Sequence, residues 1–83
     1  MKHHLTNELL KILCYQDKEK IKYTLRRDFI TSIDITNKKT KEELEIYISN
    51  DQITIDGDEL RAQMRAEPAI RYTINRVIEF CKD

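Results

Sequence analysis

The chain has 83 residues, with one glycine and one proline, which suits a single domain with a small core and argues against a disordered linker. Fifteen basic side chains balance fifteen acidic ones, so no net charge attracts the chain to nucleic acid or to an anionic membrane. The sequence shows no signal-peptide pattern and no apolar run long enough to span a bilayer, which predicts a cytoplasmic protein. Abundant lysine, isoleucine, glutamate and aspartate are typical of AT-rich bacterial or phage genomes.

The first predicted element is a helix over residues 7–15, extending at most to residue 16. Residues 1–4 are expected to fray, and Thr6 suits the N-cap of this helix. Apolar side chains recur at helical spacing and predict a face that covers a sheet. They are Leu9, Leu10, Ile12 and Leu13.

The segment 18–28 allows two interpretations. As a strand, Ile21, Tyr23 and Leu25 lie on one face and alternate strictly with polar residues. As a helix, Ile21, Leu25 and Phe29 stack at four-residue intervals, but Tyr23 then lies outside the apolar face. We therefore favour the strand.

Three further segments predict strands, at 29–36, 44–49 and 52–56, because apolar and polar side chains alternate in each. Polar turns are expected at 37–41 and at 50–51. The inward side chains would be Phe29, Thr31, Ile33, Ile35, Leu44, Ile46, Ile48, Ile53 and Ile55.

Two helices are predicted after the only glycine. Asp56 or Asp58 would cap a short helix over 59–65, where acidic side chains favour the positive helix end. The only proline then opens a last helix over 68–81, a position at which its missing N–H is tolerated. The apolar stripe of that helix would be Ile70, Ile74, Val77, Ile78 and Cys81.

The predicted fold is therefore α+β, a single domain over residues 1–83 with the element order α-β-β-β(-β)-α-α. Consecutive strands with short links predict an antiparallel meander of three to four strands, covered on one face by the N-terminal helix and the two C-terminal helices. Cys14 and Cys81 are expected to be reduced thiols rather than a disulfide, because the chain is predicted to be cytoplasmic.

An acidic stretch over 42–59 carries seven acids and no lysine or arginine. It does not match a calcium loop, since a loop that starts at Asp51 puts Ile53 and Ile55 where oxygen ligands are needed. A looser metal or ligand-sensing site stays open as an alternative at Asp56, Asp58 and Glu59. A single glycine excludes a glycine-rich phosphate loop, and no nucleophile–histidine pattern is present. We expect neither catalysis nor a cofactor.

Charge is divided unevenly along the chain. Residues 18–27 have a net charge of +4 and residues 42–59 a net charge of −7. These strands either neutralise each other within the sheet or, if separated, make the molecule a dipole. A dipole whose acidic side is exposed would be steered onto a basic partner.

We therefore expect a small, non-enzymatic regulatory protein that binds another protein as an adaptor, inhibitor or small subunit. Homodimer formation stays open as an addition to this hypothesis. Tyrosine and arginine are favoured at interface centres, and acidic side chains would provide the steering. The candidate contact residues are Glu43, Glu45, Tyr47, Asp51, Arg71, Tyr72 and Arg76.

The alternative is a nucleic-acid-binding regulator that uses the basic segment. Its candidate contacts are Lys20, Lys22, Tyr23, Arg26 and Arg27. The element order is similar to that of double-stranded-RNA-binding domains, which read shape and phosphates and carry a lysine cluster at the start of the last helix. Here that helix offers only Arg71 and Arg76, and the acidic stretch would repel phosphate.

Overall fold

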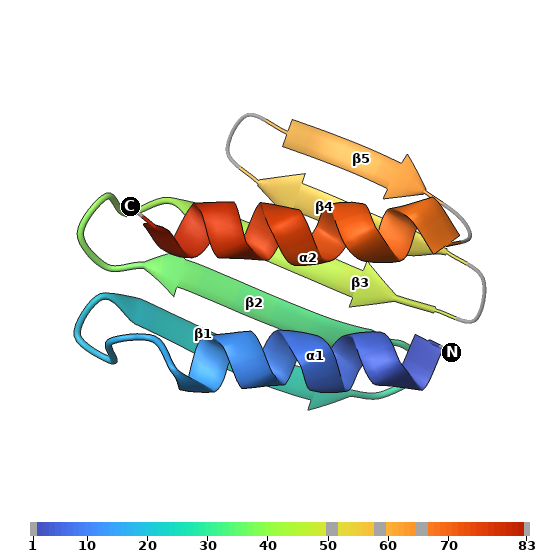
Figure 1. Ribbon diagram of the computed structural model, residues 1–83, viewed down its shortest axis with the longest axis horizontal. Helices are drawn as coiled ribbons and strands as arrows, with labels where there is room; N and C mark the ends of the chain where they lie inside the picture. Colours follow the sequence, from blue (N-terminus) through green and yellow to red (C-terminus); the bar gives the residue numbers. More distant parts are fainter. Residues whose placement is uncertain (1, 50–51, 58–59, 65–66, 83) are drawn as a thin grey trace.

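The computed structural model describes residues 2–49, 52–57, 60–64 and 67–82. It is a small α+β domain in which five antiparallel strands form one sheet in sequence order and two helices cover it (Figure 1). The elements are α1 (Lys2–Cys14), β1 (Ile21–Arg27), β2 (Thr31–Asn37), β3 (Glu43–Ile48), β4 (Ile53–Gly57), β5 (Leu60–Met64) and α2 (Glu67–Lys82).

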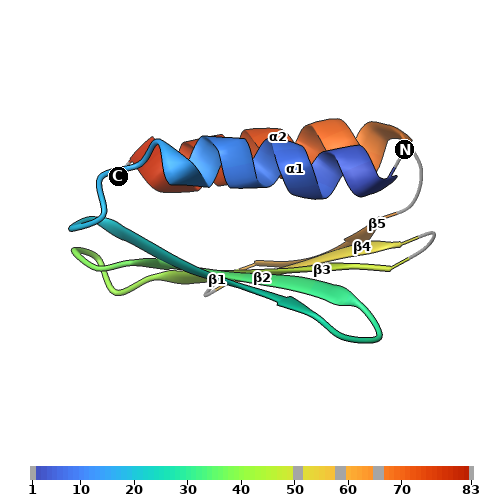
Figure 2. The ribbon, with the colours of Figure 1, turned by 90° about the horizontal axis from the view of Figure 1, so that it is seen from below.

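Both helices lie on the same face of the sheet, as Figure 2 shows, so the predicted one-sided cover is confirmed. They lie side by side and run in the same direction. The parallel direction follows from the strand count, because five antiparallel strands return the chain to the end of the molecule at which α1 began. The other face of the sheet has no helix over it in the described part of the chain.

The core lies between the helices and the sheet. In the strands it is formed by the apolar side chains at alternating positions, as predicted. Each fully buried leucine or isoleucine contributes about 1.5–3 kcal/mol relative to an exposed one. The sheet contributes Ile21, Ile33, Ile35, Leu44, Ile46, Ile48, Ile53 and Ile55, and the helices contribute Leu5, Leu9, Leu13, Ala69, Val77, Phe80 and Cys81.

The segment 59–65 was predicted to be a helix, and that prediction is wrong for the described residues 60–64, which form β5. Arg61 and Gln63 are exposed and alternate with half-buried Ala62, the period of a strand. Pairing with β4 decides the conformation, since backbone bonds to a neighbouring strand outweigh a weak local preference. Within the described residues the sheet thus has five strands rather than three or four, and one C-terminal helix follows it. Asp56 caps no helix and instead lies within β4.

The strand interpretation of the basic segment is confirmed by β1, but the inward placement of Phe29 is wrong. The ladder pairs Arg27 with Thr31, so residues 28–30 must form the turn between β1 and β2. The turn is closed by a hydrogen bond from the Asp28 N–H to the Ile30 carbonyl oxygen at 3.1 Å. Phe29 is therefore fully exposed instead of buried under the helices.

Both helices differ in detail from the prediction. α1 begins at Lys2, so Thr6 is a buried residue inside the helix rather than its N-cap. In α2 the buried side is rotated from the predicted stripe, since Ile78 is 39% exposed whereas Thr73 and Phe80 are buried. Thr73 fits the interior because its hydroxyl donates to the Ala69 carbonyl oxygen at 2.7 Å.

The predicted polar turn after β2 is confirmed. The side-chain oxygen of Asn37 accepts hydrogen bonds from the backbone N–H groups of Lys39 and Thr40, the pattern of an Asx turn. The turn predicted at 50–51 and the cap predicted at Asp58 lie outside the described residues. Cys14 is an exposed free thiol and Cys81 is a buried one.

Candidate interaction surface

The uncovered side of the sheet is formed by the side chains that alternate with the core residues, and we call it the open face (Figure 2). Every one of its side chains carries a polar or charged group. The open face comprises Lys22, Thr24 and Arg26 of β1, Ser32, Asp34 and Thr36 of β2, Glu43, Glu45 and Tyr47 of β3, Thr54 and Asp56 of β4, and Arg61 and Gln63 of β5.

Three carboxylates cross the centre of the open face on adjacent strands. The ladder places Asp34 directly opposite Glu45, and Glu45 directly opposite Asp56. A favourable cross-strand pair contributes about 0.2–1 kcal/mol, and directly opposed side chains of like charge destabilise a sheet by a comparable amount. We call Asp34, Glu45 and Asp56 the carboxylate row.

Arginines from the two edge strands neutralise both ends of the carboxylate row. Arg26 of β1 lies 3.4 Å from an Asp34 oxygen, and Arg61 of β5 lies 2.9 Å from an Asp56 oxygen. The arginine side chains are about two-thirds exposed, so each pair contributes at most about 1 kcal/mol. The basic strand β1 is not a neighbour of the acidic strands β3 and β4, because β2 lies between them. The interpretation that segments 18–27 and 42–59 pair with and neutralise each other is therefore wrong, and the two ion pairs join each edge strand to its own neighbour.

Glu45, in the middle of the row, has no basic side chain within ion-pair distance among the described residues. Its carboxylate accepts a hydrogen bond from the Tyr47 hydroxyl at 3.0 Å. Partial burial raises the pKa of Tyr47, and so do the hydrogen bond to Glu45 and the nearby carboxylates of Glu45, Asp34 and Asp56. The centre of the open face thus combines an uncompensated carboxylate with a protonated phenol.

A shallow hollow of about 140 Å³ lies beside the row, lined by Glu43, Glu45, Asp56 and Gly57. A Cβ at Gly57 would come within 3.2 Å of a Leu44 methyl group on the covered side of the sheet. In the part of the chain that the structure describes, no group of three or more histidine, cysteine, aspartate or glutamate side chains has an arrangement that could hold a metal ion.

The predicted contact residues are divided between two surfaces. Glu43, Glu45 and Tyr47 come together on the open face. Arg71 and Tyr72 belong to α2 on the other side of the molecule, where they line a separate open hollow of about 520 Å³. Pro68 and Asn75 complete that hollow.

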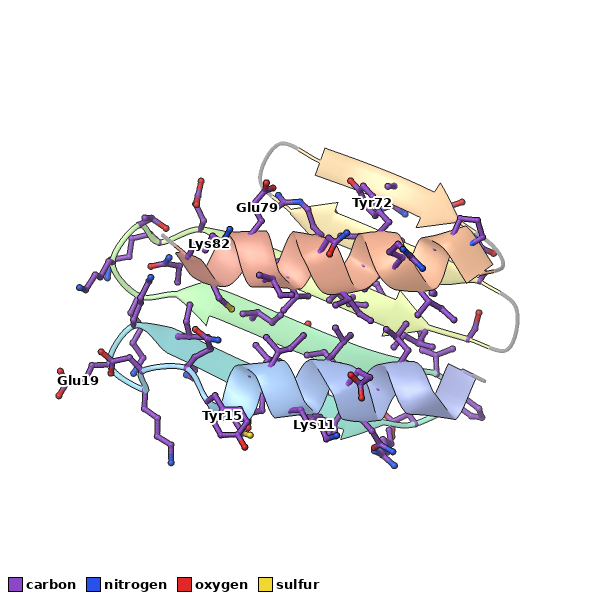
Figure 3. The ribbon with its side chains drawn as sticks, viewed as in Figure 1. Lys11, Tyr15, Glu19, Tyr72, Glu79 and Lys82 are labelled. Carbon is purple, nitrogen blue, oxygen red and sulfur yellow. The ribbon has the colours of Figure 1, made fainter. Side chains whose placement is uncertain are left out.

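Figure 3 shows Tyr72 projecting from the side of α2 nearer to β5. Arg76, the remaining predicted contact on α2, is partly buried and lies 3.9 Å from Glu79. Asp51 lies outside the described residues. The structure therefore does not bring the seven predicted contacts into a single site.

The five predicted nucleic-acid contacts are also divided. Lys22 and Arg26 lie on the open face, while Tyr23 and Arg27, at alternate positions of β1, belong to the helix side of the sheet. Lys20 precedes the strand and donates to the Lys82 carbonyl oxygen at 2.8 Å. The basic segment thus forms no continuous basic surface.

Asp34 and Arg61 were not among the predicted contacts, Phe29 was predicted only as an inward side chain, and Asp56 was predicted only as a helix cap or a loose metal ligand. Alternation alone put Asp34 on the outer side of its strand, but the register that opposes it to Glu45 is not readable from one strand. Arg61 was hidden by the incorrect helix prediction for its segment.

No protein-family model, curated protein sequence or solved structure is significantly similar to this chain. Among residues 2–49, 52–57, 60–64 and 67–82, no helix is both long enough and apolar enough to cross a membrane.

Proposed function

We propose that this chain is a small, non-enzymatic regulatory protein that binds a larger protein through the open face, as an inhibitor, adaptor or small subunit. The observation that carries the proposal is the carboxylate row across the centre of an uncovered sheet. The composition of the chain, rich in lysine, isoleucine, glutamate and aspartate, supports a bacterial or phage origin, and we propose that the protein acts in the cytoplasm.

The carboxylate row supports binding because its central member, Glu45, has no ion pair among the described residues to offset the like charges beside it. Glu45 is opposed by a like charge on both neighbouring strands, and among the described residues only the Tyr47 hydroxyl donates a hydrogen bond to its carboxylate. An arginine or lysine of a partner placed over Glu45 would relieve this repulsion, and complementary charge also increases the association rate. Tyr47 beside it offers an aromatic contact of the kind that is enriched at interface centres.

The nucleic-acid alternative has weaker support. Its five candidate side chains are divided between the two sides of β1 and the preceding turn, and Arg26 is already paired with Asp34. A phosphate backbone on the open face would also meet the carboxylate row at the centre of the sheet.

Affinity capture from the native host, followed by mass spectrometry, tests the proposal. The tagged native chain is compared with a double variant, Glu43→Lys with Glu45→Lys. We expect the partner to be captured at least about tenfold less by the variant, a change of about 1.4 kcal/mol in binding. A matched control reverses Glu8 and Glu79, exposed acids of α1 and α2, and so changes the net charge equally.

Equal capture by the two double variants would remove the open face from the mechanism. The same preparations are tested for a salt-sensitive mobility shift of duplex DNA and of RNA at low ionic strength. A shift that is weakened by substituting Lys22 and Arg26 would favour the nucleic-acid alternative instead.

A further inference from the structure

The turn between β1 and β2 presents the most exposed large apolar side chain of the described residues. Phe29 is fully exposed and the adjacent Ile30 is 43% exposed. Phenylalanine and isoleucine are among the residues most often buried in folded proteins. Two adjacent apolar side chains outside the core form an exposed apolar patch, a feature that can mark an interaction site.

The turn presents these side chains in a defined position. The β1–β2 ladder continues to its last pair, Arg27 with Thr31, so only residues 28–30 are unpaired. The Asp28 N–H bonds to the Ile30 carbonyl oxygen across Phe29 at 3.1 Å. An aromatic side chain held on a short, hydrogen-bonded turn loses little conformational freedom when it binds, which favours its use as an anchor.

The turn lies on the side of the molecule at which the open face is available. Figure 2 shows the β1–β2 turn bending away from the helix layer. A partner that covers the open face therefore meets this turn at the edge of its contact area. The turn would supply the large apolar contact that the polar open face lacks.

The size of the open face supports the same conclusion. Strands lie about 4.8 Å apart and rise about 3.4 Å per residue, so five strands of this length offer a flat area of about 400 Å². A stable interface buries about 800 Å² on each partner. Adjoining surface must contribute, and the β1–β2 turn is adjacent to the open face.

The charges around the turn indicate which partner suits it. Arg27 immediately precedes the turn, is exposed and has no ion-pair partner among the described residues, whereas Arg26 is already paired with Asp34. The turn itself carries the exposed acid Asp28 next to Arg27. A carboxylate at the rim of the partner's pocket would pair with Arg27. A membrane is a poorer match, because two apolar side chains bury less than the single acyl chain that gives only marginal membrane binding. The carboxylate row on the same side would in addition be repelled by anionic lipid.

We propose that Phe29 and Ile30 are the apolar anchor of the interface, and that they enter an apolar, acid-rimmed pocket of a partner protein while the open face lies against a basic region of the same protein. This inference rests on the proposed function, since it assigns a second contact to the same partner.

Photo-crosslinking in the native host tests the proposal. The reactive phenylalanine analogue p-benzoylphenylalanine replaces Phe29, Tyr47 or Tyr15 in three separate variants, and the crosslinked peptides are identified by mass spectrometry. Tyr15, at the end of α1, is 87% exposed and is the matched control for an exposed aromatic outside the proposed surface (Figure 3). We expect positions 29 and 47 to crosslink to one protein, and position 15 not to.

The outcomes separate this inference from the proposed function. Crosslinking from position 47 alone would overturn the anchor and leave the open face as the binding surface. Crosslinking from position 29 alone would support the turn as an anchor but contradict the open face. Crosslinks from neither position, or equal crosslinking from Tyr15, would overturn both proposals. A crosslink from position 29 to a second copy of this chain would overturn the partner protein and show that the turn mediates self-association instead.

Vesicles of phosphatidylcholine and phosphatidylserine test the membrane alternative. The chain contains no tryptophan, so Phe29→Trp introduces a single fluorescent reporter at the turn. We expect its emission to stay that of a water-exposed indole in the presence of vesicles. A shift to shorter wavelength, together with crosslinks from position 29 to lipid, would overturn the protein pocket in favour of a bilayer.

Discussion

Ile46 and Tyr47 are neighbours in β3, but Ile46 is fully buried beneath the helices and Tyr47 lies half-buried on the open face. The same alternation holds along the neighbouring strands: isoleucine and leucine face the helices, and charged or hydroxyl side chains face away. One face of the sheet therefore carries the stability of the fold. The other is free to carry charges that do not stabilise it.

The opposed carboxylates make this difference informative. A protein selected for stability alone would not place Glu45 directly opposite both Asp34 and Asp56, because a basic side chain at the central position would stabilise the sheet. Side chains that oppose folding at a small cost are typical of functional surfaces. The comparison therefore separates residues that fold the chain from residues that we propose bind a partner.

The largest expected effect comes from the covered face. Ile55→Ala removes a fully buried side chain from β4 and should reduce the free energy of unfolding by about 2–5 kcal/mol, through lost burial and the cavity left behind. Thr54→Ala, at the adjacent position on the open face, should cost less than about 1 kcal/mol. Urea denaturation measures both, and equal losses would contradict the division between the faces.

The next largest effect concerns how readily a thiol reagent reaches the core between the helices and the sheet. Burial raises the pKa of the Cys81 thiol, with Lys20 opposing the shift, so both thiolate formation and access are reduced there. Cys14 is exposed. At neutral pH a thiol reagent should modify Cys14 at least about tenfold faster than Cys81. Comparable rates in the Cys14→Ser and Cys81→Ser variants would show that the core is open to solvent.

A smaller effect of opposite sign is expected on the open face. Glu45→Gln removes the central charge of the row but keeps an oxygen that accepts the hydrogen bond from Tyr47. The free energy of unfolding should rise by about 0.2–1 kcal/mol, as the like-charge opposition is removed. Glu8→Gln, on the exposed surface of α1, is the control and should have little effect. A loss of stability in Glu45→Gln would mean that the row supports the fold.

The smallest expected effect is on the ionisation of Tyr47. Its pKa is raised above the ordinary value of 10.0, so the folded chain keeps the phenol protonated at a pH where the unfolded chain has released that proton. Stability from this group therefore falls as the pH rises above 10.0. Glu45→Gln should lower the pKa of Tyr47, which carbon-13 NMR of its ring would detect. An unchanged value would show that Glu45 has no influence on the phenol.

The apolar half of the sheet was predictable from sequence because a period of two is visible within a single strand. Leu44, Ile46 and Ile48 face inward whichever strand they pair with. β5 was not predictable in the same way, since the five residues from Leu60 to Met64 fit a helical spacing of four as well as an alternation. Contact with β4 decides between the two, and that contact is not local.

The candidate site was only partly predictable for a related reason. Glu43, Glu45 and Tyr47 could be assigned to an outer face by alternation alone. The carboxylate row could not, because it exists only in the register that opposes Asp34, Glu45 and Asp56. Phe29 continued the apolar alternation of β2, and only the Arg27–Thr31 pair shows that the strand begins after it.

The most direct measurement of the central claim is the amount of partner captured from the native host by Glu45→Gln, relative to the native chain at equal folded concentration. Removing one charge while keeping the Tyr47 contact leaves the fold intact but takes away the group that we propose faces the partner. We expect capture to fall several-fold although the variant is at least as stable as the native chain. Capture equal to that of the native chain would contradict a binding role for the carboxylate row.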